Sequence, residues 1–563
     1  MVGVDKLTAM PRRLARVPVA LTSILALSLG LRLWGIGSGL PTVYNLDEYA
    51  HFVPGAVRVS GGALNPHYFQ NPPALTYLLH VVFSVAYGVP GLPFHGSMQA
   101  ALEGDATTLY LIARVVTAVL GVGALAALFV AARRLYGDAV GLVAAALLGA
   151  TFLPVFYSHF ALNDVPTLLP LAVGLVGVAG ISTKGRRADY LLAGAGVGVA
   201  TATKYTAAAL VVAIVIAAAL RVLQDRAAAR RELTNLVLAG VAALVTFVAL
   251  NPYSVLDHKA FVDGVTRQQD QSANVAKLGT DDTSGFRYYL WTLTWGFGVV
   301  PCALAALGAG LALRRNWRRA LPWVAFALTV WIFMGAQQRF YARWFMPVYP
   351  VLAVFAAYAL VEGVKVLPRG RTLAGVALGA VVFAQPLVTV LHSDVIVDRA
   401  DTRDLAKSWL LTHVGRGAKV ASELVGPPPY FNAGSRRDGA PLFDLYPQPR
   451  GADIERYALT LTPATIDDYV ANGYCYVMTG SIIRDRALKD PDAPAAAVEY
   501  YRQLGTRGTR MAAFSPVRPG SSLPGFNFDI SYNWYPLTYV RPGPRIDIYL
   551  LKEGICSTYT EPA

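Results

Sequence analysis

Long apolar runs separated by short polar segments fill the first two thirds of the chain. The first run, residues 17–36, follows a basic N-terminus, and no small-residue cleavage pattern comes after it, so it is expected to remain as an anchor. Further runs lie at 108–132, 138–160, 165–181, 189–203, 205–221, 233–251, 287–312, 320–336, 345–362 and 371–391. Because helices of such length cross roughly 30 Å of hydrocarbon, the pattern predicts a polytopic α-helical membrane protein with about 11 transmembrane helices.

Lysine and arginine concentrate in alternate loops between these runs, on the same side as the basic N-terminus. The loops are 133–134, 184–187, 221–231, 314–319 and 365–371. Since positively charged loops stay cytoplasmic, the large first loop, 37–107, is expected outside, together with loop 252–286 and the tail, 392–563. Within the first loop, the apolar segment 74–89 is expected to form an interfacial or re-entrant helix.

Composition agrees with a place in the cytoplasmic membrane and narrows the function. Hydrophobic residues make up 55% of the 563 residues, charged residues make up 15%, and the net charge is +14. The positive charges sit in short clusters between apolar runs and not on one face of a domain. This distribution argues against nucleic acid as a partner.

The composition changes near residue 392, where the apolar runs stop and Arg, Asp, Gly and Pro become frequent. Residues 1–391 are expected to form a transmembrane catalytic domain, and residues 392–563 a C-terminal extracytoplasmic α/β domain. Its predicted helices are 402–414 and 495–504, and its predicted strands are 418–422, 474–479 and 546–551. Cys475 and Cys556 both lie in this domain, and a disulfide between them is a hypothesis for an oxidising compartment.

Three carboxylates fall on the predicted outer side. Asp47 and Glu48 follow the first apolar run, and Asp164 lies between the third and fourth runs. Carboxylates that meet in a cavity can perform general acid or base chemistry. Two plainer interpretations stay open. Adjacent acids are common in solvated turns, and Asp164 precedes Val165-Pro166 as a helix-capping residue would.

Three cations also fall on the predicted outer side, against the orientation bias. They are Lys204, Arg339 and Arg343, and the two arginines are interleaved with aromatic residues. An anionic phosphate would explain them, because ammonium and guanidinium groups bind phosphate oxygens well. The alternatives are a lysine that reaches the head-group layer and an interfacial aromatic belt.

Histidines supply a weaker case for a metal ion. His51, His67, His159 and His258 are scattered over the outer segments, without a His-x-His or Cys-x-x-Cys spacing. Structural and catalytic zinc sites usually show tighter ligand spacing. No metal site is predicted.

Several short segments, taken in their order along the chain, resemble the GT-C glycosyltransferases that use polyprenyl-phosphate sugars. The resemblance covers most of the chain and is to the bacterial branch related to protein O-mannosyltransferases and lipid A aminoarabinose transferase. One departure is Gln70-Asn71, where aminoarabinose transferases have Glu-Lys, which lowers the aminoarabinose interpretation. The segments that carry the resemblance are Asp47-Glu48, Asn71-Pro72-Pro73-Ala74-Leu75, Asn163-Asp164-Val165-Pro166, Thr203-Lys204, Asn251-Pro252-Tyr253 and Tyr341-Ala342-Arg343-Trp344-Phe345-Met346-Pro347-Val348-Tyr349-Pro350. In the tail, residues 401–410 and 415–423 also resemble the exported domain of this family.

The resemblance implies a role for each candidate residue. Asp47 would be the general base, with Glu48 and Asp164 as further cavity carboxylates. Lys204, Arg339 and Arg343 would bind the phosphate of the donor. Further cavity candidates are His51, Asn71, Tyr205 and Tyr341.

The implied function is an inverting glycosyltransferase, which moves a sugar from a polyprenyl-phosphate donor to an acceptor hydroxyl outside the membrane. The acceptor would be a protein, a lipid or a glycan. The alternative is a transporter or flippase of lipid-linked sugars, although transporters tend to place charged groups near the bilayer midplane. An anchored receptor is a third possibility, for which so many spans are excessive.

Overall fold

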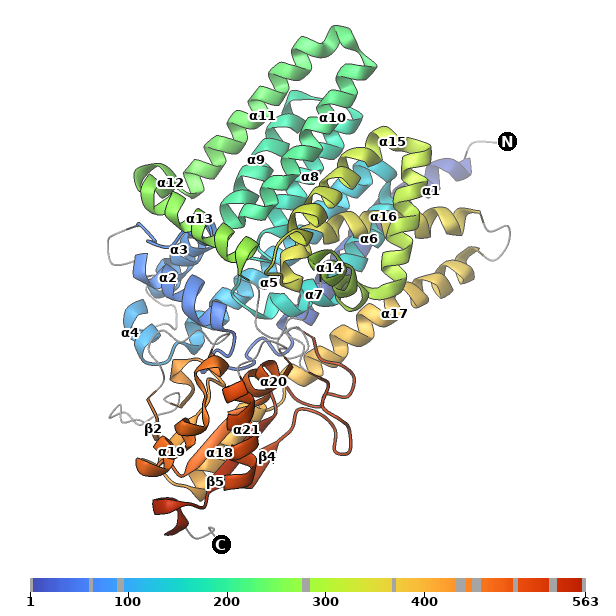
Figure 1. Ribbon diagram of the computed structural model, residues 1–563. Helices are drawn as coiled ribbons and strands as arrows, with labels where there is room; N and C mark the ends of the chain where they lie inside the picture. The colour runs from blue at the N-terminus through green and yellow to red at the C-terminus, as the bar shows by residue number, and fades with distance from the viewer. Residues whose placement is uncertain are drawn as a thin grey trace. The chain divides into compact units, whose positions relative to one another are not determined.

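A computed structural model describes residues 4–59, 64–88, 96–275, 284–366, 371–431, 442–447, 457–489, 495–525 and 534–558 (Figure 1). The chain divides into two compact units. The first, here called the membrane unit, comprises Met1–Ile36, Ala50–Val275 and Ser284–Leu391. The second, called the tail unit, comprises Gly37–Tyr49, Ala276–Thr283 and His392–Ala563. Parts of the predicted outer loops, 60–63, 89–95 and 276–283, lie outside the described residues.

Helices form nearly all of the membrane unit. They are α1 (Val4–Leu33), α2 (Val53–Arg58), α3 (Ala74–Gly88), α4 (Met98–Glu103), α5 (Thr107–Tyr136), α6 (Asp138–Ala150), α7 (Phe152–Phe156), α8 (Leu168–Thr183), α9 (Arg187–Thr203), α10 (Val211–Gln224), α11 (Ala229–Leu250), α12 (Tyr253–Leu256), α13 (His258–Asn274), α14 (Gly285–Leu293), α15 (Val299–Gly335), α16 (Tyr349–Lys365) and α17 (Arg371–Val397). Tighter or wider turns join some of them, namely η3 (Tyr157–His159), η4 (Tyr205–Leu210), η5 (Arg226–Ala228), η6 (Thr294–Gly298) and η7 (Ala342–Val348). The turn η1 (Glu48–Phe52) begins in the tail unit and ends in the membrane unit.

The apolar helices make this a multi-pass membrane protein. Among the described residues, 6 helical segments are long and apolar enough to cross a membrane, or up to 7 if the bent pair α6 and α7 is one span. Val17–Leu33, α3 and α8 are shorter apolar helices. The helix α15 departs from helical geometry at Asn316 (φ −145°, ψ 48°), between the two runs predicted there. The count of about 11 spans stays a prediction.

Small residues let α8 and α9 pack closely, and α9 in turn packs on α11 (Figure 1). A Cβ on Gly177 would collide with the backbone of Ala193, and one on Gly196 would collide with that of Gly174. Such small residues let helix backbones approach in lipid. Because α8 and α9 are joined by a short turn and run antiparallel, the chain just before α8 and the chain just after α9 meet at the same end.

The tail unit contains a five-stranded sheet with strand order β2-β1-β3-β5-β4. The strands β2, β1 and β3 are parallel, whereas β5 is antiparallel to both β3 and β4. Val420 on β1 pairs with Tyr476 on β3, and Tyr476 pairs with Leu550 on β5. The strands are β1 (Lys419–Ser422), β2 (Asp444–Leu445), β3 (Tyr476–Gly480), β4 (Gly508–Phe514) and β5 (Ile546–Leu551).

Helices contact this sheet and complete the core of the tail unit. The helix α18 contacts β4 and β5, α20 contacts β3, and α21 contacts β4, β5, α19 and α20. Their bounds are α18 (Thr402–His413), α19 (Pro463–Ala471), α20 (Ser481–Lys489) and α21 (Ala495–Arg507), and shorter turns are η8 (Pro428–Phe431), η9 (Tyr457–Thr460) and η10 (Gly554–Thr558). The predicted helices and strands of the tail correspond to α18, β1, β3, α21 and β5.

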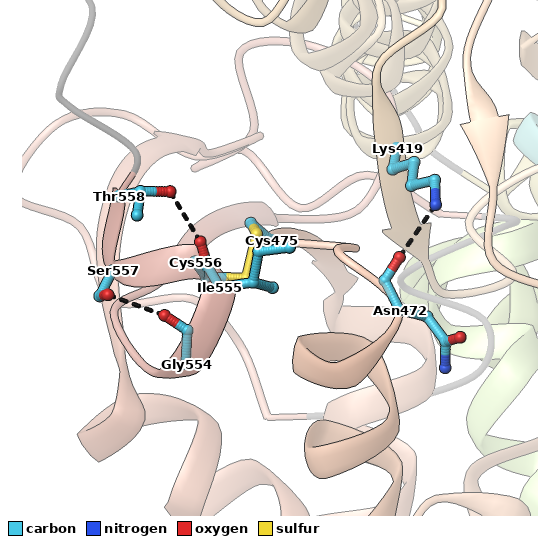
Figure 2. Close-up of a disulfide and its surroundings, with 8 residues drawn as sticks. All are labelled: Lys419, Asn472, Cys475, Gly554, Ile555, Cys556, Ser557 and Thr558. Carbon is cyan, nitrogen blue, oxygen red and sulfur yellow. Dashed lines mark hydrogen bonds between the residues drawn. A yellow bond between two sulfur atoms is a disulfide. The ribbon is translucent and has the colours of Figure 1, made fainter.

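A disulfide joins Cys475 to Cys556, with their Cα atoms 5.3 Å apart (Figure 2). Cys475 immediately precedes β3, and Cys556 lies in η10, where the hydroxyls of Ser557 and Thr558 donate to carbonyl oxygens of the same turn. The bond therefore ties the end of the tail unit to the middle of its sheet. The predicted bridge is confirmed.

Candidate functional site

Two cations of the membrane unit converge on one carboxylate. The ammonium of Lys204 donates a hydrogen bond to Oδ1 of Asp164, and Nε of Arg343 lies 3.5 Å from Oδ2 of the same residue. All three side chains are buried, with exposed fractions of 8% for Lys204, 3% for Asp164 and 9% for Arg343. Buried charges are costly unless they are paired, so this cluster is a candidate functional site.

The close packing of α8 on α9 places the first two of these residues. Asp164 lies in an irregular segment between η3 and α8, and Lys204 follows α9 in an extended conformation (φ −154°, ψ 121°) that turns the chain into η4. The N-cap of α8 is Thr167, without a side-chain cap. Asp164 therefore pairs with cations and is not the N-cap of α8, and Lys204 is buried inside the protein.

Arg343 comes from η7, and aromatic rings hold its guanidinium. The guanidinium carbon lies 4.7 Å from the ring centroid of Tyr341 and 5.7 Å from that of Tyr157. Such cation–π contacts favour a charged guanidinium in a buried setting. Tyr341 was a predicted cavity residue. Tyr157 was not, because one tyrosine in the aromatic stretch before Asp164 carries no signal of its own.

A chain of side-chain contacts links the first predicted outer loop to the segment that carries Asp164. The amide of Asn163 donates to the carbonyl oxygen of Thr203 at 2.8 Å and to Oδ1 of Asn71 at 3.4 Å. Asn71 donates to the hydroxyl of Tyr68 at 2.8 Å, and the ring of His51 stacks on Tyr68 at 4.6 Å. The structure therefore brings the predicted residues Asn71 and His51 into one network beside the cluster.

Gln70 and Asn71, at which the sequence departs from the aminoarabinose transferases, are neutral amides. Gln70 donates to the side chain of Gln271 at 3.1 Å, so this loop is held by an amide pair. Next to it, the hydroxyl of the predicted residue Tyr205 donates to the carbonyl oxygen of Phe69 at 3.0 Å. These contacts fix the first loop against α13 and η4 without charged groups.

Arg339 is half-buried, and its backbone N–H donates to the carbonyl oxygen of Ser272 at 2.9 Å. This bond joins the segment before η7 to the end of α13. The role of the Arg339 side chain stays a prediction from the sequence.

Asp47 and Glu48 belong to the tail unit, where Asn45 organises their backbone. Oδ1 of Asn45 accepts the N–H groups of both Asp47 and Glu48, each at 3.1 Å. This is the geometry in which an asparagine side chain shapes a turn. The side chain of Glu48 is fully buried and that of Asp47 is half-buried. Burial of Glu48 excludes the interpretation of this acid as part of a fully solvated turn.

An apolar groove of about 390 Å³ lies in the membrane unit, next to the segments that carry the cluster. Its walls come mainly from α3, α5, α8 and α9, with Leu75, Leu120 and Leu169 among the lining side chains. Pro166 and Thr203, close in sequence to Asp164 and Lys204, also line it. An apolar groove with charged groups near one end suits an amphipathic ligand.

In the part of the chain that the structure describes, no group of three or more His, Cys, Asp or Glu side chains could hold a metal ion. His51, which was predicted as a cavity residue, stacks on Tyr68.

Comparison with known proteins finds a match to a family model over one part of the chain and a similar fold over nearly all of it. Residues 100–251 match the family model of the dolichyl-phosphate-mannose-protein mannosyltransferases. The crystal structure of ArnT from Cupriavidus metallidurans bound to undecaprenyl phosphate has a TM-score of 0.50 at 16% identity, covering 96% of this chain and 99% of that one. No curated protein matches the sequence closely enough to count as a relative.

An archaeal structure gives the same result. The oligosaccharyltransferase AglB from Archaeoglobus fulgidus, in complex with an inhibitory peptide and a dolichol-phosphate, has a TM-score of 0.51 at 12% identity, covering 91% of this chain and 75% of that one. The chain has the GT-C glycosyltransferase fold. The resemblance inferred from the sequence is therefore confirmed at the level of the GT-C fold, and the matched residues 100–251 include the Asn163-Asp164 segment.

Proposed function

We propose that this GT-C protein is a glycosyltransferase, which moves a sugar from a polyprenyl-phosphate donor to an acceptor hydroxyl at the outer face of the cytoplasmic membrane. The observation that carries the proposal is the convergence of Lys204 and Arg343 on Asp164 beside an apolar groove. A lipid phosphate combines an anion with an apolar chain, and these are the two chemistries that the cluster and the groove offer.

An ammonium or a guanidinium group can donate to more than one acceptor at a time. A lysine carries three N–H donors and an arginine carries five, of which one carboxylate accepts only some. In the proposal, Lys204 and Arg343 bind the phosphate oxygens, and Asp164 orients both side chains. Arg339 is assigned to the same phosphate on the basis of the sequence alone.

Asp47 is assigned as the general base. It takes the proton of the acceptor hydroxyl as the acceptor oxygen forms a bond to the anomeric carbon. The bond between that carbon and the phosphate oxygen breaks at the same time, and polyprenyl phosphate leaves as an anion. One displacement inverts the anomeric configuration. Glu48 supports Asp47, and a divalent metal ion has no step in this scheme because cationic side chains stabilise the departing phosphate.

The network around the cluster favours a neutral sugar. The amides of Asn71 and Asn163 are hydrogen-bonding groups without charge, and Gln70 replaces the acidic residue of the aminoarabinose pattern. We therefore assign the donor a mannose-like or arabinose-like sugar, and the acceptor a hydroxyl on a protein, lipid or glycan.

The test is sugar transfer by purified protein in liposomes, from a panel of radiolabelled polyprenyl-phosphate sugars. The release of polyprenyl phosphate is followed separately from the formation of glycosylated product. Wild type should release polyprenyl phosphate and form product in equal amounts from one donor, and Asp47→Asn should lose roughly 10²–10⁴-fold in rate.

A matched control is Asp263→Asn, which removes an exposed carboxylate that pairs with Lys259. Its transfer rate should equal that of wild type. Undiminished transfer by Asp47→Asn would contradict the assignment of the base. Passage of a donor across the bilayer, without transfer from any donor, would contradict the proposed reaction and favour transport.

A further inference from the structure

Tyr44, three residues before Asp47, is bound to the first turn of α18. Its hydroxyl donates to Oδ1 of Asp404 at 2.5 Å, and the guanidinium carbon of Arg403 lies 3.6 Å from the centroid of its ring. The ring also packs against the hydrophobic core of the tail unit. These contacts lie within one compact unit, in which Gly37–Tyr49 is grouped with the sheet and helices of the tail.

The partner of the Tyr44 ring is itself held rigidly. Arg403 is 8% exposed and forms a two-pronged ion pair with Asp401, with both N–O distances at 2.8 Å. The hydroxyl of Tyr430 donates to the backbone carbonyl of Arg403 at 2.5 Å. Because a forked arginine–carboxylate pair fixes the plane of the guanidinium, it presents a fixed flat surface to the ring of Tyr44.

The backbone on either side of Tyr44 also points to a held segment. Val43 has φ 57° and is 2% exposed. This left-handed conformation is strained for a β-branched residue, and it persists only where surrounding contacts impose it. On the other side, Asn45 accepts the N–H groups of Asp47 and Glu48. The path from Tyr44 to the two acids is therefore short and hydrogen-bonded, so that a shift of Tyr44 is transmitted to Asp47.

We propose that the tail unit positions the carboxylate of Asp47 through the clamp of Tyr44 between Arg403 and Asp404. In this role Tyr44 and Arg403 are positioning residues, and the tail is part of the machinery that sets the turnover rate. The inference rests on the proposed function, because it concerns the residue assigned there as the base. It adds a task for the C-terminal domain that the fold alone does not assign.

The test compares Tyr44→Leu and Tyr44→Phe in the full-length protein in liposomes. Tyr44→Leu removes both the ring stacked on Arg403 and the hydroxyl, whereas Tyr44→Phe removes only the hydroxyl. Since a misplacement of about 1 Å can cost roughly 10²-fold in rate, Tyr44→Leu should lower kcat by that order and leave the KM for the donor within about threefold. Tyr44→Phe keeps the stacked ring, so it should retain most of the wild-type kcat.

Hydrogen exchange of residues 42–48 is measured on the same samples and needs no activity. Faster exchange in Tyr44→Leu, together with a lower kcat at an unchanged donor KM, supports the clamp. Unchanged exchange in Tyr44→Leu overturns it. Faster exchange with an unchanged kcat shows that the segment is held but that Asp47 is not positioned by it, and also overturns the proposal.

The matched control is Tyr446→Leu, which removes another tyrosine of the tail unit whose hydroxyl donates to an aspartate, Asp468. Its kcat and the exchange of residues 42–48 should equal those of wild type. A loss of kcat equal to that of Tyr44→Leu would show that the effect comes from the general stability of the tail unit, and would overturn the proposed role of Tyr44. If wild type transfers sugar from no donor, the proposed function fails, and the exchange measurement still decides whether Tyr44 holds the segment.

Discussion

In the membrane unit one carboxylate, Asp164, holds two cations, whereas in the tail unit acids and cations are matched around Tyr44. Lys204 and Arg343 converge on Asp164. In the tail, Arg403 pairs with Asp401, and the charges of Asp404 and Lys407 act on one another electrostatically. Both clusters are largely buried, but a carboxylate lies at the centre of the first and a tyrosine ring lies at the centre of the second.

The difference teaches how similar side chains serve two purposes. A carboxylate that draws an ammonium and a guanidinium to one place gives that place the positive charge and the N–H groups that bind phosphate. A buried cluster in which an arginine, two aspartates and a tyrosine bind one another fixes the position of the chain segments that carry these side chains. Burial raises the pKa of Tyr44, further helped by the charge of Asp401, so its hydroxyl stays a donor toward Asp404. The first cluster is assigned to binding, and the second to positioning.

The largest expected effect comes from breaking the membrane cluster at its centre. Asp164→Asn leaves Lys204 and Arg343 without the carboxylate that they share. Removing one partner of a buried ion pair should destabilise the membrane unit by roughly 3–5 kcal/mol. Thermal unfolding in detergent measures this effect.

Asp263→Asn is the control for that measurement, because the Lys259–Asp263 pair is exposed. An exposed pair of this kind contributes about 0–1 kcal/mol. Equal unfolding temperatures for the two variants would show that the Asp164 cluster contributes no more than a surface pair.

Removing the disulfide should give the next largest effect, and it tests whether the two units have separate roles. Cys475 and Cys556 are 81 residues apart, and closing a loop of that size stabilises a fold by roughly 2–4 kcal/mol. Cys475→Ala with Cys556→Ala should therefore destabilise the tail, as followed by hydrogen exchange of β3. Donor affinity should not change, because the membrane cluster has no part in this bond. A lower donor affinity in this variant would contradict the division of labour between the clusters.

More residues of the membrane cluster than of the tail cluster were predicted from the sequence. Lys204 stood out because a cation there opposes the orientation bias, and Asp164 and Arg343 fell on the same predicted side. Their pairing could not be predicted, because it depends on the close packing of glycines on α8 and α9. The contact of Arg403 with Tyr44 could not be predicted, since charged residues in the first turn of a helix are ordinary and Tyr44 lies far away in the sequence.

The secondary structure of the tail was predictable where strands are buried. The strands β1, β3 and β5 are largely buried and read as short apolar runs. The edge strand β4 has no fully buried residue, and β2 has only two residues, so neither left a hydrophobic pattern. The helices α19 and α20 were missed because their nine residues are short for a helical period to stand out.

A further effect concerns pH and the tail unit alone. Burial raises the pKa of Glu423 to about 8, although the N–H of Gly480 donates to its carboxyl group. The folded state therefore holds this proton more tightly than the unfolded chain, in which the pKa is 4.5. The stability that Glu423 contributes is full below that value and is lost as pH rises toward about 8, by roughly 1.4 kcal/mol per pH unit.

Glu423→Gln should remove this slope. The measurement is hydrogen exchange of β3 at pH 5 to 8, corrected for the intrinsic exchange rate at each pH. Glu499→Gln is the control, because hydrogen bonds from Arg502 lower the pKa of Glu499 to about 2, and it does not titrate in that window. A slope that persists in Glu423→Gln would assign the pH dependence to another group.

The most direct test of the account is the affinity of the purified protein for polyprenyl phosphate, measured for Lys204→Met and Lys259→Met. Lys204 is buried against Asp164, whereas Lys259 is exposed and pairs with Asp263. A charged hydrogen bond is worth about 1.5–3 kcal/mol, so Lys204→Met should bind polyprenyl phosphate roughly 10- to 100-fold more weakly than Lys259→Met. Equal affinities in two folded variants would contradict the assignment of the Asp164–Lys204–Arg343 cluster as the phosphate site.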